Sequence, residues 1–243
     1  MDITYQPILN LQTGRIEKCE ALCRPPEAGA DLATFVVSAE MNGSLRAYTD
    51  RVFDGVFADW QRSGPPAVDL SVNLTVADLG ETDLAKRVAK ACHRHGFDPK
   101  RLWFEVDDRA QSIADPATLE TMSQLASLGV RLSIDSFGDD LTQTTHYEVA
   151  RLPVAELKID GRYVRDADEN IRHRNVITGV VQLARDLRLH VAAKGIEREN
   201  IAALMLRLGC THGQGYYFGR PTAANVVALL VTTTPASPRP DGR

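Results

Sequence analysis

The chain has 243 residues, of which 44% are hydrophobic and 25% charged, a composition that suits one large domain with a substantial core. Its formal net charge of −4 argues against a basic surface for nucleic acid or anionic lipid. No apolar run reaches the ~18 residues of a membrane span, and the start, MDITYQPILN, lacks the features of a secretion signal. A cytoplasmic protein without a membrane or nucleic-acid partner is therefore expected.

Short strand-like runs recur along the chain. They are ITYQPIL (3–9), AVDLSVNLT (67–75), RLWFEVD (101–107), VRLSIDSF (130–137), AELKID (155–160), LHVAAKG (189–195) and QGYYFG (214–219). Amphipathic or capped segments lie between them and predict helices over residues 44–62, 84–95, 116–128, 170–187 and 197–208. His93 and His95 fall at the end of one such helix, where they suit the helix dipole better than a metal.

This strand–helix alternation, repeated seven or eight times, predicts parallel strands joined by right-handed crossovers. Both an open doubly wound sheet and a (β/α)8 barrel satisfy it. No G-x-G-x-x-G motif follows the first strand, and the length is close to the ~250 residues of a typical barrel, so the barrel is favoured. We expect a single domain over residues 1–231 and a disordered tail over 232–243, which is rich in Pro, Thr and Ser.

The four cysteines do not form a recognisable metal motif. Cys19 and Cys23 are four residues apart, but no second pair and no suitably spaced histidines complete a zinc site. Reduced thiols are expected.

Polar residues stand at or near the ends of the strand-like runs. Because the active site of a barrel lies where its strands end, seven such residues from seven segments predict one convergent cluster: Glu20, Asn73, Glu105, Asp135, Lys158, Lys194 and Gln214. The oxygen ligands among them suit Mg²⁺ or Mn²⁺, and lysine and glutamine suit phosphate oxygens. This combination is typical of phosphodiester hydrolysis by metal-activated water.

The motifs YQPIL, CEALCRP, SVNLT, SIDSFG, ELKID and QGYYFGRP resemble, in order and spacing, the EAL domain of cyclic di-GMP phosphodiesterases. The resemblance covers about residues 3 to 230. It implies a TIM-type (β/α)8 barrel with one irregular strand, and a reaction in which two Mg²⁺ or Mn²⁺ ions hydrolyse cyclic di-GMP to pGpG.

The resemblance also implies individual roles. Glu20, Asn73, Glu105 and Asp135 match metal ligands of the family, and Lys158 matches the lysine near the attacking water. Gln214 matches a supporting glutamine, and Gln6 and Arg24 match contacts to the nucleotide.

Two positions depart from the family pattern. Ser136 stands where active members have a second acid that binds the second metal, and Lys194 stands where they have a catalytic glutamate. The loop after Asp135 and the Asp107-Asp108 pair differ as well. An ammonium beside the remaining acids would take the place of a cation; alternatively, the long Lys194 stem would carry its charge into solvent. Either way, the two-metal arrangement is incomplete, and Glu20 and Lys158 are interpreted as remnants of a catalytic site.

The leading hypothesis is a degenerate EAL domain that regulates bacterial second-messenger signalling without hydrolysis and without a metal cofactor. It would act as a cyclic di-GMP receptor or through a protein partner, with homodimerisation open. The alternative is a weak phosphodiesterase that uses Mg²⁺ or Mn²⁺ to produce pGpG.

Overall fold

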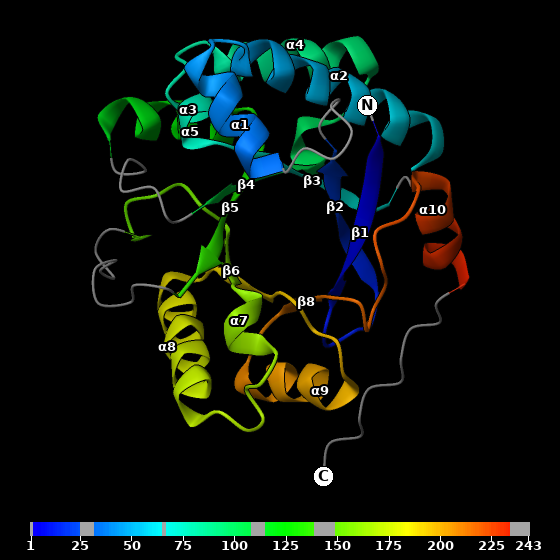
Figure 1. Ribbon diagram of the computed structural model, residues 1–243, viewed down its shortest axis with the longest axis vertical. Helices are drawn as coiled ribbons and strands as arrows, with labels where there is room; N and C mark the ends of the chain where they lie inside the picture. The colour runs from blue at the N-terminus through cyan, green and yellow to red at the C-terminus, as the bar shows by residue number, and fades with distance from the viewer. Residues whose placement is uncertain (1, 25–31, 65–66, 108–114, 139–148, 234–243) are drawn as a thin grey trace.

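A computed structural model describes residues 2–24, 32–64, 67–107, 115–138 and 149–233, and it forms a closed eight-stranded barrel wrapped by helices (Figure 1). The strands follow one another around the barrel in chain order. Their bounds are β1 (Ile3–Asn10), β2 (Ile16–Cys23), β3 (Asp69–Leu74), β4 (Leu102–Asp107), β5 (Arg131–Phe137), β6 (Glu156–Ile159), β7 (His190–Ala193) and β8 (His212–Gln214). The predicted barrel is confirmed, and the open sheet is wrong.

Strand β1 is the irregular strand of the barrel. It runs antiparallel to both of its neighbours, β2 and β8, whereas every other adjacent pair is parallel. The tight turn between Asn10 and Arg15 makes this possible, since a hairpin connects antiparallel strands without a crossover helix. The strand-like runs did not include β2, because its Glu17, Lys18 and Glu20 break the apolar pattern of a buried strand.

The helices cover the outside of the barrel (Figure 1). They are α1 (Leu32–Met41), α2 (Leu45–Ser63), α3 (Val76–Leu79), α4 (Leu84–His95), α5 (Pro116–Ser127), α7 (Gly161–Val164), α8 (Ile171–Leu187), α9 (Glu199–Leu208) and α10 (Ala224–Thr233). A 3-10 turn, η1 (Pro99–Arg101), precedes β4. Helix α10 packs beside β1 and α2, so the end of the described chain lies next to its beginning.

Capping residues explain where several of these helices begin and end. Asp115 accepts hydrogen bonds from the backbone of Ala117 and Thr118 with a proline at the first helical position, which confirms the predicted start of α5. Gly96 ends α4 in the left-handed conformation, as its position after the amphipathic run predicts. Helix α8 ends instead at Arg188, a non-glycine residue with φ of 58°.

The apolar core lies between the barrel and the helix layer. A row of aromatic rings from Phe53, Phe57, Phe97 and Phe104 joins α2 to β4, with centroids 5.0–5.9 Å apart. This packing fixes the outer wall, and the inside of the barrel is left for polar side chains.

Most predicted strand and helix boundaries lie within two residues of the observed ones, and two differences matter most. Strand β8 ends at Gln214 rather than at Gly219, because the chain turns sharply at Gly215, whose added Cβ would lie 2.0 Å from the carbonyl oxygen of Ile196. Helix α10 continues through Thr233, two residues into the predicted tail; the remainder of that tail lies outside the described residues. Within the described part of the chain, no helix is long and apolar enough to cross a bilayer.

Candidate functional site at the mouth of the barrel

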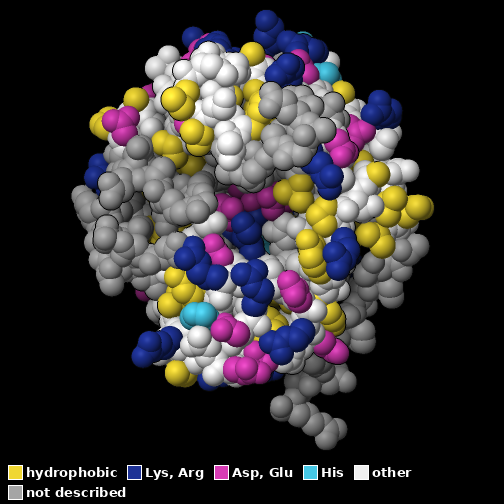
Figure 2. All heavy atoms as spheres, in the orientation of Figure 1, with side chains coloured by type: hydrophobic (Ala, Val, Ile, Leu, Met, Phe, Trp, Pro, Cys, Tyr) yellow, Lys and Arg dark blue, Asp and Glu magenta, His cyan; other side chains and the backbone are white. Residues whose placement is uncertain are grey.

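The seven polar residues predicted to converge come from the seven strands β2 to β8. Glu20, Asn73, Glu105, Asp135, Lys158 and Gln214 lie on β2, β3, β4, β5, β6 and β8, and Lys194 directly follows β7. Figure 2 shows acidic and basic side chains gathered in a hollow at the centre of the face formed by the carboxyl ends of the parallel strands. Hydrogen bonds join all seven into two neighbouring groups.

Glu20 is the centre of the first group. Its Oε1 accepts a hydrogen bond of 2.8 Å from Asn73 Nδ2, and its Oε2 accepts one of 2.7 Å from Gln214 Nε2. The ammonium of Lys158 lies 3.1 Å from the same Oε2. Both carboxylate oxygens are thus engaged by donors of this chain.

Lys158 bridges two carboxylates inside the barrel. Its side chain is fully buried, and its Nζ donates to Oε2 of Glu105 as well as to Glu20. Ser71 Oγ donates to the other oxygen of Glu105 at 2.6 Å. Such a buried ammonium is stable only because two carboxylates compensate its charge.

The two buried acids respond differently to their surroundings. Burial alone would raise the pKa of Glu20, but the charges of Lys158 and Lys194 together with the Asn73 and Gln214 hydrogen bonds hold it at about 2. Burial and repulsion by Glu20 raise the pKa of Glu105 to about 7, against the attraction of Lys158. The pair shares one ammonium, so Glu105 is the acid that takes up a proton first.

Lys194 and Asp135 form the second group. The Lys194 Nζ lies 2.8 Å from Asp135 Oδ1 and 2.7 Å from Oδ2, so the ammonium faces the whole carboxylate. The two side chains are 27% and 14% exposed, which places the pair at the open side of the mouth. The alternative in which Lys194 extends into solvent is therefore wrong.

The end of β7 is held in place by close backbone packing. Gly195, with φ of 71°, follows Lys194, and an added Cβ there would lie 3.1 Å from the Cα of Gly161 at the start of α7. Gly161 and Gly195 therefore let the ends of β6 and β7 approach each other, which fixes the backbone from which Lys194 extends.

Ser136 adopts an unusual backbone conformation at the end of β5. Its φ is 56°, in the left-handed region that non-glycine residues rarely occupy, and its side chain is almost buried. A serine hydroxyl there carries no charge, so the position adds nothing to hold a divalent cation.

The other predicted ligand contacts differ in their placement. Gln6 joins the cluster: its Oε1 accepts from Gln214 at 3.1 Å, and its Nε2 donates to the carbonyl of Gly219 at 3.2 Å. Arg24 lies outside it, with a side chain 75% exposed and 3.8 Å from Asp2. Asp108 and the loop over 139–148 lie outside the described residues.

The residues present do not fit a pair of divalent cations. Lys194 engages both oxygens of Asp135, Lys158 engages Glu20 and Glu105, and Asn73 directs its amide nitrogen at Glu20. Among the described residues, no three acidic, histidine or cysteine side chains are arranged so that they could hold a metal ion.

Two features of the barrel interior escaped prediction. The first is Ser71. The alternation in DLSVNL puts Ser71 on the same side of the strand as Asn73, and this signal could have predicted its place in the cluster. The second is another polar layer at the opposite end of the barrel. There Glu156 Oε1 lies 2.6 Å from Lys18 Nζ and 3.0 Å from Ser133 Oγ. The His212 ring completes that layer, 3.7 Å from Glu156 Oε2.

Comparison with known proteins identifies the family. The model of the EAL domain matches residues 1–221. Two Pseudomonas aeruginosa proteins, the bifunctional diguanylate cyclase/cyclic di-GMP phosphodiesterase MucR and the cyclic di-GMP phosphodiesterase NbdA, are each 30% identical to this chain over 93% and 91% of its length. The match spans about a third of each of these relatives, 34% of MucR and 29% of NbdA.

Solved structures agree in fold. The PaMucR phosphodiesterase in complex with c-di-GMP superposes with a TM-score of 0.83 at 29% identity, covering 93% of both chains. The EAL domain of FimX from Pseudomonas aeruginosa, bound to c-di-GMP, gives a TM-score of 0.79 at 23% identity over 92% of this chain and 91% of that one. With a barrel whose first strand is reversed, a polar cluster at its mouth and a family model that matches 221 residues, the chain belongs to the EAL domain family.

Proposed function

We propose that this chain is a cyclic di-GMP receptor that does not hydrolyse its ligand. The observation that carries this proposal is the Lys194 ammonium placed on both oxygens of Asp135. The lysine ammonium therefore engages the carboxylate that a divalent cation would need as a ligand.

Electrostatics supports the loss of metal binding. Glu20, Glu105 and Asp135 bring three acidic groups to the mouth, and Lys158 and Lys194 bring two positive charges. At ~4 Å and an effective dielectric of ~20, two unit charges interact by about 4 kcal/mol, and a divalent ion would be repelled by about twice as much. A metal would therefore have to displace Lys194 from Asp135 first.

Nucleotide binding is supported by the parts of the site that do not depend on metal. Gln6 and Gln214 remain hydrogen-bonded to each other in the cluster, and Gln214 keeps one amide oxygen without a partner among the described residues. The similarity to structures solved with c-di-GMP supports the same ligand class. A regulator that binds the second messenger without destroying it would pass the signal to a protein partner.

Two measurements test this proposal. Isothermal titration calorimetry with cyclic di-GMP in EDTA should show binding at one site per chain, and incubation with Mn²⁺ should release no pGpG. Turnover that is abolished by Glu20→Ala would establish the weak phosphodiesterase instead. Absence of nucleotide binding under all conditions would leave a protein-interaction module.

A further inference from the structure

We propose that Lys194 and Arg165 form a phosphate-binding pair at the end of β7, which holds a phosphodiester group of the nucleotide in place of a metal ion. This inference rests on the proposed receptor function and assigns the charged contact that such a receptor needs.

Lys194 has the donor that this role requires. A lysine ammonium carries three N–H donors, and both hydrogen bonds of Lys194 go to the single carboxylate of Asp135. No other described residue accepts from it. With 27% of its side chain exposed at the mouth, Lys194 can turn its third donor towards a ligand.

Lys158 cannot take this role. Its side chain is fully buried, and its ammonium is shared between Glu20 and Glu105. Any phosphate that approached it would have to displace a buried carboxylate. Of the two lysines in the cluster, only Lys194 can make a new contact without breaking the existing ones.

Arg165 supplies a second positive charge close to the backbone that follows Lys194. This exposed residue ends α7, and its guanidinium folds back over the start of that helix. Its Nη1 lies 3.4 Å from where a Cβ of Gly161 would stand and 3.7 Å from where a Cβ of Gly195 would stand. The guanidinium is therefore next to the residue that follows Lys194.

The guanidinium of Arg165 is unpaired within the described part of the chain, in contrast to its neighbours. Arg162 pairs with Asp160 at 3.3 Å, and Arg198 pairs with Asp168 at 3.0 Å. Arg198 also donates to the carbonyl oxygen of Arg165, which fixes its backbone. An unpaired arginine next to the residue that follows a partly exposed lysine is a suitable site for a phosphodiester anion, because both side chains make charge-assisted hydrogen bonds to phosphate oxygens.

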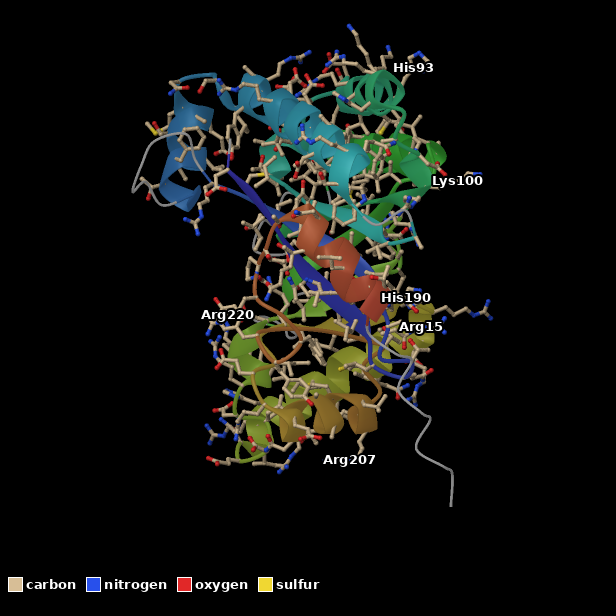
Figure 3. All side chains as sticks on the ribbon, turned by 90° about the vertical axis from the view of Figure 1, so that its right-hand side faces the viewer. Arg15, His93, Lys100, His190, Arg207 and Arg220 are labelled. Atoms are coloured by element: carbon tan, nitrogen blue, oxygen red, sulfur yellow. The ribbon has the colours of Figure 1, made fainter. Side chains whose placement is uncertain are left out.

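Calorimetry with cyclic di-GMP in EDTA tests the pair on the intact chain. Lys194→Met should weaken binding by about 10- to 100-fold, and Arg165→Gln by about 3- to 10-fold, the usual range for a lost hydrogen bond to a charged group. Lys100→Met and Arg15→Gln serve as controls. Both residues are exposed on the side of the barrel opposite the mouth, as Figure 3 shows, and their changes should leave affinity within about twofold.

A double change separates phosphate binding from simple neutralisation of Asp135. If Lys194 only cancels that charge, then Lys194→Met combined with Asp135→Asn should bind as tightly as the unaltered protein. The proposed pair predicts that the double variant stays at least about 10-fold weaker, because the donor is still missing. Circular dichroism confirms that each variant is folded.

The outcomes distinguish the two proposals. Binding by the unaltered chain together with normal affinity in Lys194→Met, or recovery in the double variant, would overturn the phosphate-binding pair and leave the receptor function standing. Failure of the unaltered chain to bind would overturn the receptor function and the pair with it.

Discussion

The ammonium of Lys194 lies within 2.8 Å of both carboxylate oxygens of Asp135, and this pair lies at the open side of the barrel mouth. The relationship has two consequences. It removes Asp135 as a free metal ligand, and it leaves a positive group that is 27% exposed at the mouth. Substitutions at this pair and at the residues around it test metal binding, nucleotide binding and the stability of the barrel interior.

Adding carboxylates at positions 194 and 136 should create a metal site. Lys194→Glu with Ser136→Asp adds two carboxylates next to Asp135, and we expect Mn²⁺ affinity to rise by at least about 100-fold, given interactions of about 4 kcal/mol per charge pair at ~4 Å. Electron paramagnetic resonance of free Mn²⁺ measures this. Lys100→Glu makes one of the same charge changes on the opposite face and should leave Mn²⁺ affinity unchanged. If the double variant binds no more Mn²⁺ than this control, local charge is not the cause.

Removing Lys158 should destabilise the protein. Lys158→Met leaves Glu20 and Glu105 buried without their shared cation, and breaking a buried ion pair costs about 3–5 kcal/mol. Urea unfolding followed by circular dichroism measures the loss. Adding Glu105→Gln to Lys158→Met should recover part of it, whereas Lys100→Met alone should cost less than about 0.5 kcal/mol. A loss below about 1 kcal/mol for Lys158→Met would contradict this account of the cluster.

The left-handed conformation of Ser136 should be relieved by glycine. Ser136→Gly is expected to stabilise the chain by about 0.5–1 kcal/mol, because a non-glycine residue at φ of 56° is strained. Arg188→Gly, at φ of 58° and far from the mouth, should give a similar gain in the midpoint of urea unfolding. Ser133→Gly is a control in which the effect should have the opposite sign. Ser133 lies in β5 and donates to Glu156, so removal of its hydroxyl should lower the stability of the chain. Equal effects at 133 and 136 would contradict the strain argument.

The polar layer at the other end of the barrel should make stability depend on pH. Burial, with a smaller effect of Lys18, lowers the pKa of His212 below its usual 6.5 despite the attraction of Glu156. The Nε2 atom of His212 lies 3.1 Å from Oε2 of Glu17. The His190 ring also packs on His212. The unfolded chain thus binds more protons than the folded one just below pH 6.5. The stability that neutral His212 contributes is present above pH 6.5 and falls as the pH drops towards the folded pKa.

Glu156 extends this loss to lower pH. Burial would raise its pKa, but Lys18 and His212 lower it below 4.5, so its contribution is present above pH 4.5 and disappears on further acidification. We expect His212→Gln to make the slope of unfolding free energy against pH less positive between pH 7 and about pH 5, because the opposite contribution of Glu105, whose pKa is raised to about 7, remains; urea unfolding at each pH measures this slope. His93→Gln, an exposed histidine on α4, should keep the slope of the unaltered chain. An unchanged slope in His212→Gln would show that this histidine is not responsible.

Sequence predicted the barrel and the members of the mouth cluster because both depend on local patterns. Runs such as SVNLT and ELKID alternate with period two, and parallel strands bring their carboxyl ends to one face, where Asn73 and Lys158 both reach Glu20. The β2 strand was harder to see, since Lys18 and Glu20 point into the barrel, where charged residues are rarely expected.

Other features could not follow from local patterns. The direction of the Lys194 side chain depends on the position of Asp135, 59 residues away, and on the contact between Gly161 and Gly195. The partnership of Lys18 with Glu156 joins residues 138 positions apart. Both are set by the register of the closed barrel, which composition and periodicity do not specify.

The most direct test is anomalous diffraction from crystals of the unaltered chain soaked in Mn²⁺. We expect no pair of manganese peaks at the mouth, with the Lys194 ammonium still in contact with Asp135. Two manganese ions bound beside residues 135 and 194, with the lysine displaced, would contradict it.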